Sequence, residues 1–410
     1  MYLGFLKNIG KVASSAGLSQ LLPILSQILL VRMLVPEAFG AFAGWMAFVS
    51  VLAVVLTLRL EHSLVIEDTY SKRLRILLGI RLTIILISLC TIVIFFAFEY
   101  LIDWRFEFGS LGLICGVLSA ICMADNNTML AVYSSSSKYS DLNVQRLMFA
   151  CSTSFGQLIL CYYNPVAESL YWGYTLGGLS CLIFAYKKTR LRFDSLSQSK
   201  LTLLRLWSRR KKFVIYSLPA DTISAVSGQL PIILVIAMYG EAMGGYIAIV
   251  LRMVGAPLGL VSLAILDVFK GDAARAGAEN AGYNGIFVRT LGVLVALSFL
   301  YVILSYGLAS SAFELIFGEE WAMAGTIAVA MTPLFASRFI ASPLSYMVYL
   351  TQNQRVDLIW QLVMLIVVCL SLTLPSNFES ALALYVWGLS AMYGCYLILS
   401  YLMANRGAKF

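Results

Sequence analysis

The sequence predicts an all-α integral membrane protein of about twelve transmembrane helices, arranged as two six-helix halves around a central cavity. Of its 410 residues, 60% are hydrophobic and 12% are charged, whereas a soluble domain carries roughly 25% charge. The apolar runs have the length of about 20 residues that a helix needs to cross a bilayer. They lack the alternation of barrel strands, so helices must satisfy the backbone polar groups in lipid. These observations exclude an ordinary water-soluble enzyme.

The helix count comes from apolar runs that are separated by charged or turn-forming residues. In the first half of the chain, the predicted spans are 12–33, 39–60, 76–98, 110–133, 142–163 and 166–186. In the second half they are 213–239, 243–267, 285–308, 321–348, 355–374 and 380–403. The predicted organisation is therefore an N-terminal half (1–187), a basic cytoplasmic linker (188–212), a C-terminal half (213–403) and a cytoplasmic tail (404–410).

Charged residues sort by the side of the membrane. Basic residues such as Lys72 and Lys138 dominate every second loop, and acidic residues such as Glu99 dominate the loops between them. Excess Lys and Arg marks cytoplasmic loops, so both termini are expected in the cytoplasm. Residues 187–212 contain ten basic residues and a single acidic one, Asp194. This segment is expected to lie on anionic lipid, so the net charge of +8 indicates membrane contact and no nucleic-acid partner.

The two halves share a short repeat. The sequence PEAFGAF at 36–42 recurs as GEAMGGY at 240–246, and each copy opens a span. Upstream, QLLPI at 20–24 resembles QLPII at 229–233. Because six spans per half leave both halves facing the same way, an axis along the membrane normal should relate them. A cleft between the halves is the expected transport pathway, although two turns rich in Gly and Ala can also match by chance.

Four arginines inside the predicted spans are the candidate substrate-binding residues: Arg252, Arg338, Arg146 and Arg32. An ionisable side chain that faces lipid costs several kcal/mol, so it is expected to face a wet cavity or a partner. Arg252 and Arg338 are interpreted as the deepest cations of the chain. Arg146 and Arg32 lie nearer the ends of their spans, where long side chains can instead reach the headgroups.

A polar stripe marks the first span of each half. Ser217, Asp221 and Ser224 follow one another at helical spacing in the seventh span, and Gln20 and Gln27 lie in the first. The stripes predict that these two helices line the cleft. The alternative is that the small residues allow neighbouring helices to pack closely.

Two aspartates, Asp125 and Asp221, are costly inside a span. Each can pair with an arginine, or can bind a proton or a sodium ion that drives transport. The chain has one histidine, His62, and no CxxC pair, so no metal site and no other cofactor are expected.

Two stretches resemble a known family. LVPEAFGAF at 34–42 and GYIAIVLRMVGAPL at 245–258 are similar to Wzx-type polysaccharide (O-antigen) flippases, whose superfamily also holds lipid II flippases and multidrug and toxin (MATE) extruders. The resemblance implies that the chain moves polyprenyl (undecaprenyl) diphosphate-linked oligosaccharide units, for O-antigen lipopolysaccharide or a related polysaccharide, to the outer leaflet of a bacterial inner membrane. It implies alternating access, a cationic cavity to which Arg252 contributes, and polysaccharide polymerase machinery as a further partner beside membrane lipids.

Three competing functions fit the residues less well. A multidrug extruder needs acidic and aromatic surfaces, whereas this chain places more arginine than acid deep in its spans, which favours an anionic cargo. A membrane-embedded polymerase, ligase or glycosyltransferase commonly carries a large extracytoplasmic loop, but the long loop here is the basic linker, so no enzyme is expected. A structural scaffold would leave Arg252 and Arg338 unexplained.

Overall fold

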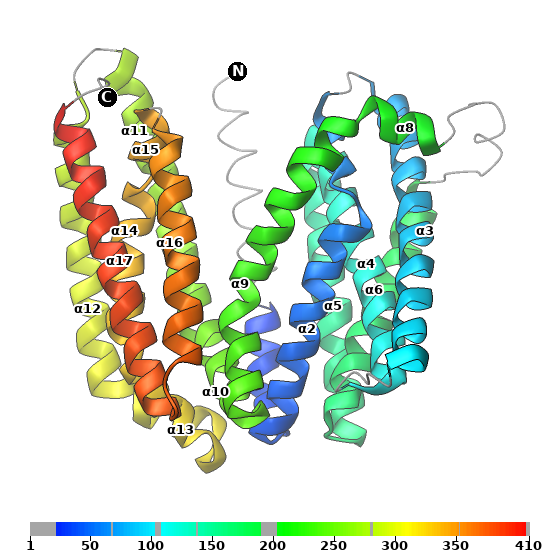
Figure 1. Ribbon diagram of the computed structural model, residues 1–410, viewed down its shortest axis with the longest axis horizontal. Coiled ribbons are helices and arrows are strands. Elements are labelled where there is room, and N and C mark those ends of the chain that lie inside the picture. Colours follow the sequence, from blue (N-terminus) through cyan, green and yellow to red (C-terminus); the bar gives the residue numbers. More distant parts are fainter. Residues whose placement is uncertain are drawn as a thin grey trace. The chain divides into compact units, whose positions relative to one another are not determined.

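The computed structural model describes residues 22–66, 69–102, 108–136, 138–189, 203–278, 282–351 and 353–406. In these ranges every regular element is a helix (Figure 1). Contacts divide the chain into two compact units, residues 1–229 (unit 1) and residues 230–410 (unit 2). The division falls inside helix α9 (Leu218–Tyr239). The boundary that the sequence places at residues 188–212 remains a prediction.

Eight helical segments of the described ranges are long and apolar enough to cross a membrane, or nine if a bent pair counts as one span. They are Pro36–Leu56 (α2), Lys72–Leu101 in α3 (Tyr70–Ile102), Gly109–Ser135 (α4), Phe213–Tyr239, Glu241–Ala273, Asn284–Phe317 (α12), Arg355–Thr373 and Phe378–Asn405. The bent pair, Glu319–Ala330 and Thr332–Leu350, turns by 50°. A multi-pass helical membrane protein is confirmed, but fewer spans qualify than the twelve expected.

Three expected spans account for this difference. Helices α5 (Tyr139–Tyr163) and α6 (Ala167–Thr189) cover two of the expected ranges but are not apolar enough to qualify. The reason for α5 is that it buries polar side chains, among them Gln145 and Gln157. Residues 12–21 of the remaining expected span, 12–33, lie outside the described residues, and its described part contains an apolar helix, Leu22–Val31, that is too short to qualify.

Unit 1 contains α2 to α6, with the 3-10 turn η1 (Leu60–Ile66), the short helix α8 (Leu203–Arg209), the π-helical turn η2 (Phe213–Ser217) and the first half of α9. The backbones of helices α5 and α6 are in contact at Gly173. A Cβ atom at this position would lie only 2.5 Å from the Cα atom of Gln157. In the core, Trp45 stacks on Tyr171 with 4.8 Å between ring centroids. Its Nε1 atom donates a hydrogen bond of 2.9 Å to the carbonyl oxygen of Gly112.

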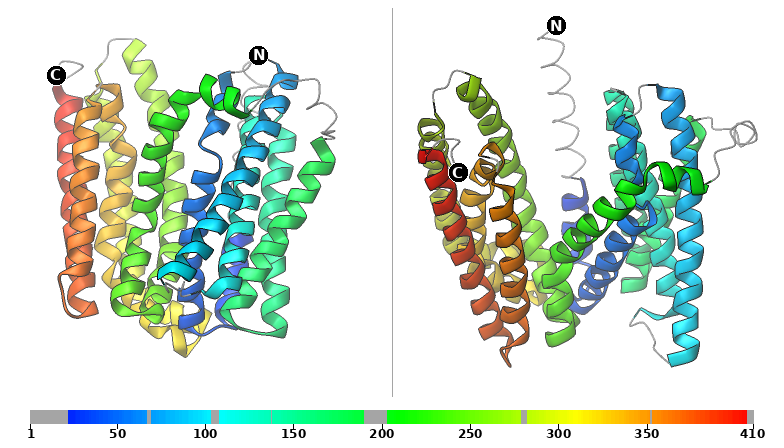
Figure 2. Two further views of the ribbon diagram at one scale, coloured as in Figure 1. Left: turned by 45° about the vertical axis from the view of Figure 1, so that its right-hand side comes forward. Right: turned by 45° about the horizontal axis from the view of Figure 1, so that its top comes forward.

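Unit 2 begins within α9 and contains the remaining helices. They are α10 (Glu241–Val250), the π-helical turn η3 (Leu251–Gly255), α11 (Ala256–Ala278), α12, η4 (Glu319–Trp321), α13 (Ala322–Ala330), α14 (Thr332–Leu344), α15 (Met347–Leu350), α16 (Gln354–Thr373) and α17 (Phe378–Arg406). Helices α16 and α17 run side by side in both views of Figure 2, and Trp360 of α16 stacks on Tyr396 of α17 at 4.4 Å. The stacked rings fix the register of α16 against α17.

Candidate functional site

Asp221 is held in an ion-pair cluster at the start of α9. Its Oδ2 atom accepts a hydrogen bond from Arg59 Nε at 2.6 Å and lies 3.4 Å from His62 Nε2. Arg59 also donates from Nη1 to Glu61 Oε1 at 2.9 Å. Of the two alternatives for Asp221, the structure therefore shows pairing with an arginine. All four residues of this cluster belong to unit 1.

The backbone that presents Arg59 is strained. Leu58 and Arg59, directly after α2, have φ values of +48° and +56°. A residue other than glycine in this left-handed region costs about 1–3 kcal/mol, and here two such residues follow one another. The Thr57 hydroxyl oxygen accepts a hydrogen bond from the Arg59 backbone nitrogen at 3.2 Å, which supports the turn. The turn directs Arg59 toward two carboxylates, Glu61 and Asp221.

Asp125 is paired as well, in the helical core of unit 1. Arg81 of α3 donates to it twice, from Nε to Oδ1 at 2.6 Å and from Nη2 to Oδ2 at 3.2 Å. The side chains of Arg81 and Asp125 are 12% and 5% exposed. Such a bidentate pair orients both groups and neutralises the carboxylate away from water. Of the two alternatives for Asp125, the structure therefore also shows pairing with an arginine.

Arg338 differs from these two arginines. It lies on α14, is exposed, and lines a groove of about 210 Å³ between α11 and α14 of unit 2. The hydroxyl-bearing residues Ser262, which is buried, and Ser342, which is exposed, line the same groove. Among the described residues, Arg338 forms no ion pair with a carboxylate. Its guanidinium therefore has hydrogen-bond donors available for a ligand.

Two other predicted residues lie in π-helical turns. Arg252 is half-buried in η3, which joins α10 to α11, and Ser217 is half-buried in η2, which precedes α9. A π-helical turn inserts an extra residue into a helix and is frequently found at functional sites. Each unit therefore has a π-helical turn that contains one of the site residues predicted from the sequence.

The remaining predicted residues are spread over unit 1. Arg32 is exposed and lines an apolar groove of about 610 Å³ with aromatic residues of α5, including Phe155 and Tyr162. Arg146 is half-buried on α5. Along with Arg252 and Arg338 in unit 2, each unit therefore holds two of the four candidate arginines.

The polar stripes lie only partly within the described residues. Ser224 is exposed on α9, whereas Gln27 is half-buried in the helical segment that precedes α2. Gln20 lies outside the described residues. The cavity-lining role of these side chains, and of Ser217, remains a prediction.

Comparison with known proteins identifies the family. The profile described as "Polysaccharide biosynthesis protein" matches residues 29–326, more than half of the chain. The chain belongs to this polysaccharide biosynthesis protein family. No curated protein gives a significant match to the sequence.

Solved structures show the fold of this polysaccharide biosynthesis protein. The inward closed conformation of the lipid II flippase MurJ is similar with a TM-score of 0.70 and 14% identity, over 96% of this chain and 90% of that chain. An inward-facing multidrug resistance MATE transporter of the MOP superfamily is similar at 0.63 and 13%, over 94% of each chain. A MOP transporter from Pyrococcus furiosus is similar at 0.56 and 13%, over 98% and 95%. The protein has the fold that MurJ shares with transporters of the MOP superfamily.

Sequence reasoning missed the cations that hold the two aspartates in this polysaccharide biosynthesis protein. Arg81 lies inside the expected span 76–98, so the interpretation of Arg252 and Arg338 as the deepest cations omitted a buried arginine. The rule that singled out Arg338, a charge within an apolar run, applies equally to Arg81. Arg59 lies at the end of the expected span 39–60, and its strained turn leaves no signal in the sequence.

Proposed function

We propose that this polysaccharide biosynthesis protein is a flippase for polyprenyl-diphosphate-linked oligosaccharide units, such as those of O-antigen or a related surface polysaccharide. It moves them from the cytoplasmic to the outer leaflet of the bacterial inner membrane by alternating access, with both of its termini in the cytoplasm. The polymerase machinery that consumes such units is the expected downstream partner. The family match and the MurJ-like fold support this proposal.

The contrast between paired and unpaired arginines is the observation that carries the proposal. Arg59 and Arg81 are bound by carboxylates of their own unit. Arg338, near the middle of the segment Thr332–Leu350, is exposed in a groove and has no carboxylate partner among the described residues. A charge at such a depth is expensive unless water or a ligand compensates it. An anionic ligand accounts for its position.

A diphosphate suits this guanidinium chemically. Arginine presents its donors in a planar fork that binds two phosphate oxygens at once, and such charge-assisted bonds are stronger than neutral ones. In the groove, Ser262 and Ser342 add hydroxyl groups that can donate to the remaining oxygens. Under this proposal the arginines bind the diphosphate while it and the sugar cross the membrane, and the lipid tail stays in the bilayer. No covalent bond changes.

The multidrug alternative has less support within the described residues. Asp125 and Asp221 do not supply the acidic surface that a cationic drug needs, since each is bound by an arginine. The similarity to MATE transporters is a similarity of fold at 13% identity and does not decide the cargo.

The proposal is tested in a strain that lacks the protein and is complemented with variants. We expect the deletion to accumulate lipid-linked repeat units on the inner leaflet, and the wild type to clear them. Arg338→Ala and Arg252→Ala should insert into the membrane normally but fail to clear the units. Arg355→Ala is the matched control, because Arg355 is an exposed arginine at the start of α16, outside these turns and grooves.

Two results would overturn the proposal. Full surface polysaccharide in both the Arg338→Ala and Arg252→Ala strains would remove the role of the arginines. Deletion without accumulation of lipid-linked units, but with increased drug sensitivity, would favour the multidrug extruder.

A further inference from the structure

The groove that contains Arg338 also contains a glycine on its opposite wall. Arg338 belongs to α14, and Gly259 of α11 lines the same groove. All of the residues that line it lie within the described ranges. Helices α11 and α14 run in the same direction, from the end of unit 2 that contains α10 and α13 to the end that contains α15 (Figure 1). Successive residues of α11 therefore face successive residues of α14 in the same order.

The distance between the two helices changes along this groove. At one end, a Cβ atom on Gly255 would lie 3.1 Å from the Cε1 atom of Phe335, so the backbone of α11 packs against that ring. One helical turn further along α11, a Cβ atom on Gly259 would meet no atom within 4 Å. Arg338 follows Phe335 by about one turn on α14. The groove is therefore open at the level of Arg338, where another residue at position 259 would place a side chain.

The size of the groove limits what can bind beside Arg338. Its volume is about 210 Å³. Because a water molecule takes up about 30 Å³ in the liquid, this volume corresponds to roughly seven water molecules. That is enough for one or two phosphate groups but not for a chain of several sugars. The groove can therefore hold the charged part of a lipid-linked unit, whichever glycan the unit carries.

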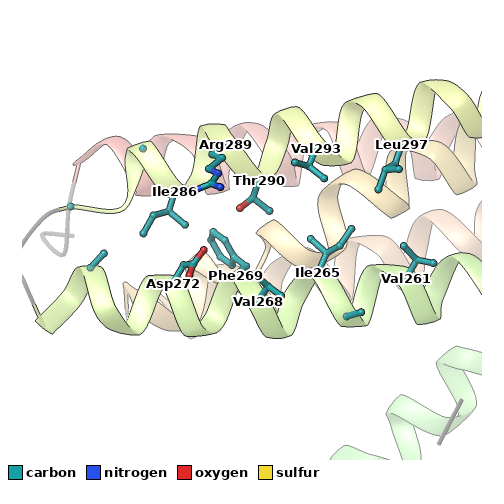
Figure 3. Close-up of a pocket in the computed structure, with 14 residues that line it drawn as sticks. Val261, Ile265, Val268, Phe269, Asp272, Ile286, Arg289, Thr290, Val293 and Leu297 are labelled. Atoms are coloured by element: carbon teal, nitrogen blue, oxygen red, sulfur yellow. The ribbon is translucent and has the colours of Figure 1, made fainter. Parts of the chain in front are cut away.

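Helix α11 borders a second groove, which differs in its lining. This groove has a volume of about 870 Å³ and runs between α11 and α12. Figure 3 shows that its lining is aliphatic at the level of Val261 and Ile265, where Val293 and Leu297 face them from α12. Of the two grooves, the one that contains Arg338 is thus the one that offers a cation near the middle of the span Glu241–Ala273.

We infer that Gly259 is a specificity-determining residue, because its lack of a side chain opens the space in which Arg338 binds the diphosphate of a prenyl diphosphate. The groove recognises this diphosphate without the glycan. The inference rests on the proposed function, since it states which part of the proposed cargo this groove binds. A side chain at position 259 would fill the space and keep the phosphate oxygens away from the guanidinium. Exclusion should therefore increase from alanine to valine to leucine.

The test measures binding of farnesyl diphosphate, a prenyl diphosphate that carries no sugar. The full-length protein in mild detergent is titrated with it, and the rise in unfolding temperature gives the affinity. We expect the wild type to be stabilised and Arg338→Ala to lose this effect. Gly259→Val should bind at least about tenfold more weakly, as overpacking of a well-defined space predicts, and Gly259→Leu should show no binding.

Inorganic pyrophosphate distinguishes a lipid-linked ligand from a free one. It should bind more weakly than farnesyl diphosphate, but the same substitutions at positions 259 and 338 should weaken it, since both probes share the diphosphate. Pyrophosphate that binds as tightly as farnesyl diphosphate would assign the groove to free pyrophosphate and would overturn the inference.

The matched control is the same series of substitutions at Gly292. This glycine is exposed on α12 within the span Asn284–Phe317, does not line the Arg338 groove, and its added Cβ would also meet no atom within 4 Å. Both series change helix propensity equally, so an effect of propensity would appear in both. Unfolding temperatures without ligand check that each variant is folded. The Gly292 variants should keep the wild-type affinity.

The outcomes separate this inference from the proposed function. Absence of farnesyl diphosphate binding in the wild type, unchanged affinity in Gly259→Leu, or equal losses in the Gly259 and Gly292 series would each overturn the inference. A wild type that binds farnesyl diphosphate in a manner dependent on position 259, but does not flip lipid-linked units in vesicles, would contradict the proposed function and leave the assignment of Gly259 in place.

Discussion

Arg59 Nε lies 2.6 Å from Asp221 Oδ2, and this contact ties the end of α2 to the beginning of α9. Helix α9 starts in unit 1 and ends in unit 2. We expect a change in the direction of its first half relative to α2 to lengthen the ion pair. The strained turn at Leu58 and Arg59 would be free to relax once the ion pair is broken.

Of the two paired aspartates, Asp221 is the one at which we expect proton coupling, through opening of its ion pair with Arg59. The Asp221 side chain is 34% exposed and lies next to His62, which is 46% exposed, so water reaches both groups. Asp125 is buried and bound by two nitrogens of Arg81. We expect Asp221→Asn to change how flipping responds to an imposed pH gradient, while Asp125→Asn leaves that response unaltered.

The measurement is the initial rate of flipping of a lipid-linked substrate in vesicles, with and without the gradient. His62→Gln provides a further variant, since it keeps a side chain of similar size but removes the imidazole that lies next to Asp221. A rate that ignores the gradient in the wild type and in all three variants would exclude proton coupling at these groups.

The Arg81–Asp125 pair should contribute to stability mainly through the cost of separating its members. Arg81→Ala leaves Asp125 buried without its partner, and such a loss typically destabilises a protein by about 3–5 kcal/mol. The double variant Arg81→Met/Asp125→Leu should recover most of that loss, because it removes both charges. Thermal unfolding of the detergent-solubilised protein measures both effects, with Arg355→Ala as the surface control. A single variant as stable as the wild type would contradict the prediction.

Close packing of α5 against α6 should depend on Gly173. A Cβ atom at this position would lie 2.5 Å from the Gln157 Cα atom, and backbone atoms cannot move aside as a side chain can. We expect Gly173→Ala to lower the free energy of unfolding by about 1–3 kcal/mol, as overpacking does in other cores. Gly228→Ala on α9 is the matched control, since no atom lies within 4 Å of its added Cβ. Equal thermal stability of the two variants would show that α5 and α6 can separate without cost.

The sequence predicted the helices of this protein better than its site. Apolar runs identified α2, α3 and α12 because lipid imposes a minimum length and low polarity on each span. Helices α5 and α6 also form at the expected ranges, although the polar side chains that they bury in unit 1 make them less apolar than the other spans. Periodicity did not predict the π-helical turns, since a single extra residue leaves the apolar pattern almost unchanged.

The partners of the two aspartates show a second limit. Arg59 and Asp221 are 162 residues apart in the sequence, and no spacing rule connects a turn after one helix with the start of a distant one. Arg81 and Asp125 were accessible in principle, since both are charges within apolar runs. The assignment of Arg338 to a groove needed the structure, because the sequence does not show which face of α14 meets α11.

Arginine at position 338 should be replaceable by lysine only in part. Arg338→Lys keeps the positive charge but loses the planar fork, so a diphosphate exchanges a bidentate contact for a single point of attachment. Because each charge-assisted hydrogen bond contributes about 1.5–3 kcal/mol, we expect Arg338→Ala to slow flipping by at least about tenfold and Arg338→Lys to retain an intermediate rate. The measurement is the initial rate in vesicles, corrected for the amount of inserted protein. Since Arg338 is exposed and pairs with no carboxylate among the described residues, both variants should unfold at the temperature of the wild type. A lysine variant as slow as the alanine variant would indicate a strict need for the fork, and an alanine variant as fast as the wild type would remove Arg338 from the transport pathway.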